Sequence, residues 1–262
     1  MPSNSSRLYP PLPARLYGVW FRHMRVYTRN LLSNGLPPFL EPLIFLGGIG
    51  LGLGHYVEEM NGVPYIEFLA AGLLMTSAMF TAAFECSFGT FIRLEFDKVY
   101  DGMLAAPMSV ADLIVGEILW AGTKGLFFTC TVLTIVGSFG LVPFPRSLLT
   151  PLVGFLTGVM FATLSLLVSS FVKNINHFNF YFTGLLSPMF FFSGVVFPLE
   201  NLPPAVRPIA EIVPLTHSVR LVRHLVAWEW TGTAVLDLGY ILVFSGVFGF
   251  LAVRRLKKRL IH

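Results

Sequence analysis

Long apolar runs divide the sequence, and six of them are long enough to cross a lipid bilayer. A membrane helix needs roughly 20 mostly apolar residues to cross about 30 Å of hydrocarbon. Each run is apolar on all sides, as is typical of helices that face lipid, and none shows the two-residue alternation of a half-buried strand. The predicted spans are 37–56, 64–86, 113–136, 148–171, 178–199 and 234–253. We therefore expect an all-α, polytopic membrane protein with six transmembrane helices.

The N-terminal segment, 1–36, precedes the transmembrane domain, 37–253, and has a different pattern. It contains five arginines, no acidic residue and no apolar core of a cleavable signal peptide. A helix over 14–31 gathers its basic side chains within an arc of about 80°, namely Arg15, Arg22, Arg25 and Arg29. We expect this interfacial amphipathic helix to lie on the cytoplasmic leaflet with its arginines towards lipid headgroups, and Gly35-Leu-Pro-Pro38 to end it. It either serves as an anchor or also contacts a cytoplasmic partner.

Composition and charge exclude several classes of protein. Hydrophobic residues make up 55% of the chain and charged residues 12%, whereas soluble domains are about 25% charged. A water-soluble enzyme, a disordered chain and a disulfide scaffold are therefore poor interpretations. Thirteen of the 18 lysines and arginines, including those of the basic tail, 254–262, fall on one side of the predicted spans and four on the other. This asymmetry predicts cytoplasmic termini and contact with lipid headgroups, not with nucleic acid.

Motifs for catalysis are missing from the sequence. The loop G-x-x-x-x-G-K-[ST] that binds ATP does not occur, and the histidines are scattered without the spacing of metal ligands. The segment 97–106, DKVYDGMLAA, resembles the acidic motif of CDP-alcohol phosphotransferases. However, three residues instead of two separate its first acids, and Ala106 replaces an arginine. We therefore expect no catalytic residue, no metal site and no enzyme activity in this chain.

The cytoplasmic loop 93–107 combines charged side chains with apolar ones. It is too apolar for a solvated linker, and an exposed surface of this kind usually has something to bury against. The loop either meets a partner protein or packs on its own helix bundle.

Three of the charged residues inside the predicted spans, Glu85, Glu117 and Lys124, are candidates for an intramembrane charge network. An ionised side chain near the bilayer centre costs roughly 2.5 to 3.5 kcal/mol, so these groups should face protein. Glu117 and Lys124 lie seven residues apart on one helical face, about 10 Å along the axis, which is too far for a direct pair. Because the second and third spans run in opposite directions, Glu85 should lie at a depth between them. We predict an ion pair between Glu85 and Lys124, with a structural role or a place on the substrate path.

Two further features have alternative interpretations. In the first span, Gly48 with Gly52 and Gly50 with Gly54 have the spacing that permits close helix contact, either between two copies or within one. The outer segment 200–233 is too polar to span, and its prolines leave room for short helices over 205–212 and 216–226 that re-enter the membrane. There, Arg220 and Arg223 share a helical face. They either meet an anionic headgroup or glycan or remain solvated, and the solvated pair is the favoured alternative.

The order of several motifs resembles the permease subunits of type 2 ABC exporters, in particular the nodulation-factor branch, NodJ. The likeness covers nearly the whole chain. Its segments are FLAAGLLMTSAM at 68–79, Phe84-Glu85, GEILWAGTK at 116–124, PMFFFSGVVFP at 188–198, Leu202-Pro203, and PLTHS at 214–218 followed by Leu221 and Arg223.

This resemblance implies a homodimeric permease of the cytoplasmic membrane that works with two copies of a separate ABC ATPase. The partner would bind ATP and Mg²⁺, so this chain would need no cofactor. The helix over 14–31 would be the connecting helix, and the loop 93–107 would dock on the ATPase through Arg93, Glu95, Phe96, Asp97, Lys98, Tyr100, Asp101 and Met103. The implied cargo is a lipo-oligosaccharide or other lipid-linked glycan, with glycolipid, polyketide drug and polysaccharide as alternatives. A secondary transporter and a membrane-embedded lipid enzyme are the competing classes.

Overall fold

The computed structural model describes residues 9–57, 59–60, 62–228 and 231–260. Three predicted segments lie partly outside this description. They are the N-terminal segment at 1–8, the outer segment at 229–230 and the basic tail at 261–262. The only strands in the described residues form a short antiparallel hairpin, β1 (Glu59–Met60) with β2 (Val63–Pro64). The α-helices are α1 (Leu12–Arg29), α2 (Leu31–Phe45), α3 (Gly52–Gly54), α4 (Tyr65–Phe84), α5 (Val99–Leu104), α6 (Val110–Ser138), α7 (Thr150–Ser169), α8 (Phe178–Tyr181), α9 (Ser187–Phe192), α10 (Arg207–Ile212), α11 (Pro214–Ala227) and α12 (Gly232–Leu260).

Wider π-helical turns join several of these helices into longer ones. They lie at Leu46–Leu51 between α2 and α3, at Glu85–Gly89 and Ile92–Phe96 after α4, and at Phe182–Leu186 between α8 and α9. Short 3-10 turns occur at Arg146–Leu149, Ile175–His177 and Leu199–Asn201.

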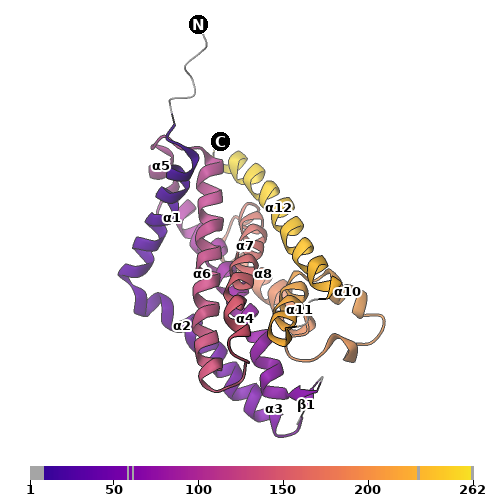
Figure 1. Cartoon of the computed structure of the whole chain (residues 1–262). Coiled ribbons are helices and arrows are strands. Elements are labelled where there is room, and N and C mark those ends of the chain that lie inside the picture. The colour runs from indigo at the N-terminus through magenta and orange to yellow at the C-terminus, as the bar shows by residue number, and fades with distance from the viewer. Residues whose placement is uncertain (1–8, 58, 61, 229–230, 261–262) are drawn as a thin grey trace.

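Four helices of the described chain are long and apolar enough to cross a membrane, and they form the bundle in Figure 1. They are Tyr65–Phe96, Val110–Ser138, Arg146–Ser169 and Gly232–Leu260. The predicted spans 64–86, 113–136, 148–171 and 234–253 fall on them. The helix Tyr65–Phe96 occupies the centre of the bundle, since 83% of its most apolar 18-residue stretch is buried. In α12, only 17% of the corresponding stretch is buried. An all-α membrane fold follows from these elements.

The other two predicted spans coincide with shorter helices. The prediction 37–56 falls on α2 to α3, where the apolar helix Pro42–Gly54 is shorter than a full crossing. The prediction 178–199 falls on α8 and α9, which end at Phe192 because Gly194 adopts a left-handed backbone conformation with φ of 82°. Helix length alone therefore supports four of the six spans.

The N-terminal helix α1 covers most of the predicted segment 14–31 and packs along α6. The expectation that all of its arginines face lipid headgroups is wrong for Arg15, which pairs with Asp112, and for Arg22, which lines a cavity between helices. A Cβ atom on Gly116 would lie 2.6 Å from the Cβ of Val19, so this glycine permits close contact between the two helices. The Trp20 indole donates a hydrogen bond to Thr123, and Arg15 pairs with Asp112. The turn after α1 lies at Asn30, not at Gly35–Pro38 as predicted, because asparagine readily leaves the helical conformation.

Glycines also bring α6 and α7 close together. A Cβ atom on Gly125 would lie 2.7 Å from the Gly154 carbonyl oxygen and 3.1 Å from the Cα of Gly158. Small residues at such positions allow two membrane helices to approach closely. It fixes the position of α6, which contributes Glu117 and Lys124 to the site described below.

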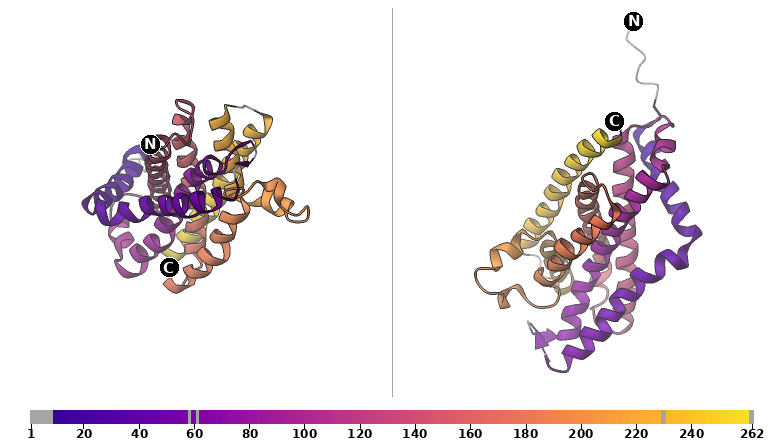
Figure 2. Two further views of the ribbon diagram at one scale, coloured as in Figure 1. Left: turned by 90° about the horizontal axis from the view of Figure 1, so that it is seen from below. Right: turned by 180° about the vertical axis from the view of Figure 1, so that it is seen from behind.

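Different helices lie at the two ends of the bundle. The start of α1, the helix α5 and the end of α12 lie at one end, whereas α3 and the β-hairpin lie at the other (Figures 1 and 2). The short helices α10 and α11 lie beside the first half of α12 (Figure 1). They occupy the positions expected for the helices over 205–212 and 216–226.

Candidate functional site

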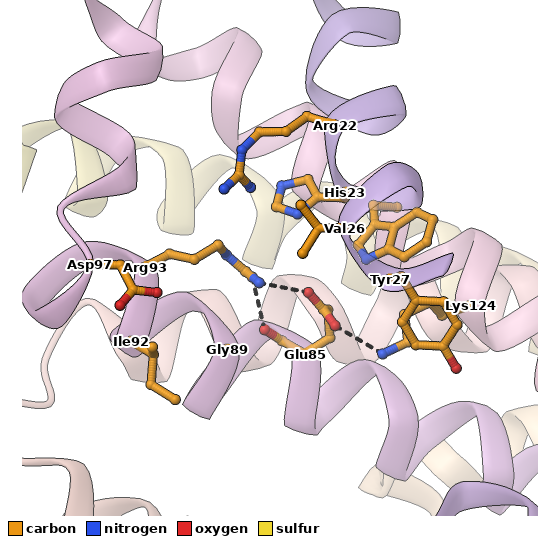
Figure 3. A pocket seen from close by; sticks show the side chains of 11 residues that line it. Arg22, His23, Val26, Tyr27, Glu85, Gly89, Ile92, Arg93, Asp97 and Lys124 are labelled. Carbon is orange, nitrogen blue, oxygen red and sulfur yellow. Dashed lines mark hydrogen bonds and ion pairs between the residues drawn. The ribbon is translucent and has the colours of Figure 1, made fainter. Parts of the chain in front are cut away.

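The predicted ion pair between Glu85 and Lys124 is present. The Lys124 Nζ donates to Glu85 Oε2 over 2.8 Å, and Arg93 Nη1 donates to Glu85 Oε1 over 2.8 Å. Both carboxylate oxygens of Glu85 are therefore occupied by cations from different helices, as Figure 3 shows. The Lys124 side chain is 11% exposed and the Glu85 side chain 13%, so the pair is largely removed from solvent.

The guanidinium of Arg93 connects two glutamates. Besides Glu85, it reaches Glu117, whose Oε1 lies 3.1 Å from Arg93 Nε. Its Nη2 also donates to the Glu85 carbonyl oxygen over 3.1 Å. A planar guanidinium has five N–H donors in a fixed fork, which allows one side chain to hold several acceptors at once. The side chain folds back past Gly89, where a Cβ atom would lie 3.1 Å from Nη1.

Glu117 is the most deeply buried of these acids, with its side chain 2% exposed. Its Oε2 accepts a hydrogen bond from Thr90 over 2.9 Å, and its Oε1 lies 3.2 Å from His23 Nε2 of α1. The buried Tyr100 side chain of α5 also interacts with Glu117 and Arg93. Burial, together with the Glu117 carboxylate, raises the pKa of Tyr100 well above the ordinary value of tyrosine.

We call His23, Glu85, Arg93, Tyr100, Glu117 and Lys124 the buried charge cluster. Its two carboxylates are balanced by one guanidinium and one ammonium. Glu117 Oε2 accepts a hydrogen bond from Thr90, and Glu117 Oε1 lies within ion-pair distance of Arg93 and His23. Charged groups removed from water require such pairing, since breaking a buried pair typically costs about 3 to 5 kcal/mol. The cluster thereby fixes α1, α5, α6 and the continuation of α4 relative to one another.

The predicted ATPase-contacting loop divides into a buried part and an exposed part. Arg93 and Tyr100 were predicted to contact the ATPase. They instead belong to the buried charge cluster and are not part of an exposed contact surface. Met103 is half-buried and packs with Leu94 on the helix bundle. For this residue, the alternative prediction that the loop packs on its own bundle applies. Glu95 pairs with Arg259 over 2.8 Å and lies 3.9 Å from Lys98. The exposed members are Phe96, Asp97, Lys98 and Asp101, which we call the exposed turn.

A second polar cluster joins the short outer helices to α12. Asp237 of α12 accepts hydrogen bonds from Arg220 over 2.8 and 2.9 Å, and its Oδ1 lies 2.7 Å from His217 Nδ1. Arg220 also pairs with both oxygens of Glu211 over 2.9 Å. Hydrogen bonds to Asp237 and Glu211 raise the pKa of Arg220 above its ordinary value. The Tyr240 ring stacks on His217 at 3.7 Å between centroids.

The predicted solvated pair of Arg220 and Arg223 is wrong. Arg220 belongs to the ion pairs just described, and the Arg223 guanidinium lies 3.7 Å from the centre of the Phe68 ring. Its Nη2 donates to the Phe68 carbonyl oxygen over 3.3 Å. Burial lowers the pKa of Arg223 to about 10. Both arginines therefore hold α11 against the bundle, because α4 and α12 present partners that the sequence spacing does not reveal.

Sequence reasoning missed His23, Thr90 and the inward direction of Arg93. The apolar residues after Glu85, among them Phe88 and Phe91, are the signal that the second span continues to Phe96. A longer span carries Arg93 inside the bundle instead of into a loop. In the described part of the chain, no three His, Cys, Asp or Glu side chains gather as a metal site.

Comparisons with known proteins agree on one family. The sequence profile described as "ABC-2 type transporter" matches residues 15–226. The chain is 32% identical over 252 residues to Nodulation protein J of Sinorhizobium fredii, covering 96% of each chain. It is also 32% identical over 242 residues to Nodulation protein J of Rhizobium meliloti, covering 92% of each. A more distant relative is the inner membrane transport permease YadH of Escherichia coli, 25% identical over 235 residues and covering 89% of this chain and 91% of that one.

Proposed function

The chain belongs to the ABC-2 type transporter family and is a membrane transporter subunit, and from this premise we propose that it is the permease of an exporter driven by a separate ABC ATPase. Subunits of this family are transport components and not catalytic enzymes. ATP and Mg²⁺ would be bound by the partner, and this chain would convert the partner's movements into a change of its transmembrane helices.

One observation supports this mechanism most directly: Arg93 lies between the exposed turn and two buried glutamates. The exposed turn begins at Phe96, whose side chain is 63% exposed, three residues after Arg93 on the same helix. A partner that moves this turn also moves the Arg93 guanidinium and hence its contacts to Glu85 and Glu117. Glu85 is in turn paired with Lys124 of α6. The buried charge cluster thus offers a path of direct contacts from the cytoplasmic end into the bundle.

The proposed topology has six crossings of the cytoplasmic membrane and both termini in the cytoplasm. The helix from α2 to α3 and the helix from α8 to α9 would supply the first and fifth crossings, each shorter than the other four. The helices α10 and α11 would re-enter the membrane from the outer side. The basic end of α12 supports this orientation, since the start of α1 and the exposed turn lie at the same end of the bundle (Figure 1).

We also propose a homodimer that forms through α2 and α3. Gly50 packs internally, since a Cβ there would lie 3.3 Å from Ile66. By contrast, added Cβ atoms on Gly48 and Gly52 would meet no described atom within 4 Å. This open glycine face is continued by Ile44 and Leu51, which are 69% and 68% exposed. Such a face allows a second helix to approach closely.

The proposed cargo is an amphipathic, lipid-linked glycan such as a lipo-oligosaccharide. The support is the similarity to Nodulation protein J of several organisms over more than nine-tenths of the chain. A glycolipid, a polyketide drug or a polysaccharide is the alternative. Uptake of radiolabelled lipo-oligosaccharide into inverted vesicles, compared with the same glycan lacking its acyl chain, distinguishes these classes. Export without preference for the acylated form would contradict the lipid-linked cargo.

The partner is tested by isolating the tagged chain from native membranes in mild detergent and identifying what remains bound by mass spectrometry. We expect a near-stoichiometric ABC ATPase that is lost when Asp97, Lys98 and Asp101 are replaced by alanine. The matched control replaces Lys257 and Lys258, which are exposed at the same end of the bundle, and should keep the partner. Recovery of the chain alone, even after crosslinking, would favour a self-contained carrier or enzyme.

A further inference from the structure

The side chain of Arg22 enters a cavity of about 290 Å³ between α1, α6 and the continuation of α4. Figure 3 shows Arg22 and Arg93 directed into this space from different helices. Every other cation that lines the cavity has an acidic partner, since Arg93 pairs with Glu85 and Glu117, and Lys124 pairs with Glu85. Among the described residues, no ion pair or hydrogen bond is found for the Arg22 side chain. Glu117 and Asp97 act on the Arg22 charge only at a distance, so within the described residues this charge has no direct ion-pair partner in the cavity.

The electrostatics of the cavity favour an anion beside Arg22. Burial and the positive charge of Arg93 both lower the pKa of Arg22. Two guanidinium groups that face one cavity repel each other, and an anion between them removes this repulsion. Glu85 does not fill this role, because both of its carboxylate oxygens already accept from Arg93 and Lys124. Guanidinium groups bind phosphate oxygens well, since their paired N–H donors match the spacing of two oxygens.

The cavity wall changes from polar to apolar. Val26 and Ile92, which are 53% and 37% exposed, line the cavity together with Trp120. A ligand that is charged at one end and apolar at the other matches this wall. The volume lies at the lower limit of small-molecule sites, about 300 Å³, so it suits a headgroup and not a whole glycan.

We propose that this cavity binds the phosphate group of an anionic membrane lipid, with Arg22 as the principal cation. The inference rests on the proposed position of α1 at the cytoplasmic surface of the membrane, where anionic headgroups are available. It does not depend on the ATPase partner or on the cargo. A bound lipid would join α1 to the helix that contains Arg93, and so act on the same cluster as the exposed turn.

Two competing partners for Arg22 predict different results. A soluble phosphate ion has the same chemistry at Arg22 but needs no acyl chain. The exposed Asp97 carboxylate, which also lines the cavity, becomes an internal partner if its side chain turns towards Arg22. The experiment separates both of these from a lipid.

The full chain is purified in detergent, without ATPase or cargo, and incubated with phosphatidylglycerol, with phosphatidylcholine, or with inorganic phosphate. Retained lipid is measured by native mass spectrometry and stabilisation by the thermal midpoint. The Arg22→Gln variant is compared with Arg25→Gln, because Arg25 is exposed on the same helix. We expect Arg22→Gln alone to reduce phosphatidylglycerol retention about fivefold, which corresponds to the loss of one headgroup–cation contact of about 1 kcal/mol.

Three results would overturn the proposal. Equal retention of phosphatidylglycerol by the wild type and Arg22→Gln would show that Arg22 does not bind lipid. Stabilisation by inorganic phosphate without preferential lipid retention would assign the site to a soluble anion. Equal thermal destabilisation by Arg22→Gln and Asp97→Asn, without any effect on lipid retention, would assign Arg22 to an internal ion pair. Because the assay uses the chain alone, each result leaves the proposed exporter function to its own test.

Discussion

Lys124 Nζ lies 2.8 Å from Glu85 Oε2, although the two residues are 39 positions apart and belong to different membrane-spanning helices. The contact joins the central helix to α6 at the level where Arg93 also reaches Glu85. A charge pair inside a membrane bundle has no water to replace a lost partner, so removing one member leaves the other uncompensated. The consequences of this arrangement are measurable.

Glu85→Gln should destabilise the protein by about 3 kcal/mol, because it leaves the buried Lys124 ammonium without its carboxylate. Lys124→Gln should destabilise it less, because Arg93 still pairs with Glu85. The double variant should be less destabilised than the sum, by about 1 to 3 kcal/mol. The measurement is a double-mutant cycle on thermal unfolding in detergent, followed by size-exclusion chromatography. Additive effects would mean that the two side chains do not interact.

Gly125→Ala should loosen the contact between α6 and α7. The new Cβ would lie 2.7 Å from the Gly154 carbonyl oxygen, and backbone atoms cannot move aside cheaply. We expect a loss of about 1 to 3 kcal/mol, as for overpacked cores. Gly137→Ala on the same helix meets no atom within 4 Å and should be neutral or slightly stabilising. Equal thermal midpoints for the two variants would contradict this packing.

Asp237→Asn should release the short outer helices from α12. The Asp237 side chain is 1% exposed and balances Arg220 and His217, so its neutral replacement leaves Arg220 with Glu211 alone. We expect a loss of about 3 kcal/mol and faster proteolysis between α10 and α12. Glu200→Gln, a change at an exposed carboxylate of the same outer segment, serves as the control. An unchanged proteolysis rate for Asp237→Asn would argue against this anchoring role.

Leucine at Gly48 and Gly52 should disrupt the proposed homodimer while the monomer remains folded. Neither position has a described atom of a neighbouring element within 4 Å of an added Cβ, so a side chain begins there in open space within one copy. The oligomeric state is read from native mass spectrometry, and Gly246→Leu on α12, which is equally open, is the control. A dimer that persists in the Gly48→Leu and Gly52→Leu double variant would place the interface elsewhere.

The apolar pattern predicted the helical class and the four longest spans, because burying or lipid-exposing 20 or more apolar residues leaves a strong signal. The Glu85–Lys124 pair was predictable too, since two intramembrane charges of opposite sign on antiparallel helices need a partner. The rest of the buried charge cluster was not. His23 lies on a surface helix whose burial depends on Gly116, and Arg93 turns inward because π-helical turns extend the central helix to Phe96.

The outer arginines show the same limit. Their spacing places Arg220 and Arg223 on one face of α11, but only the packing of α12 and α4 provides Asp237 and Phe68 as partners. Tertiary contacts of this kind involve residues far apart in sequence, and no local pattern reports them.

Whether Arg93 couples the exposed turn to the buried glutamates is tested by measuring transport by the Arg93→Gln variant in proteoliposomes with the partner ATPase. We expect a folded complex that still hydrolyses ATP but transports about tenfold less cargo, equivalent to roughly 1.4 kcal/mol of lost coupling. Lys173→Gln, at an exposed lysine, should transport normally. Unchanged transport by a folded Arg93→Gln complex would contradict the claim.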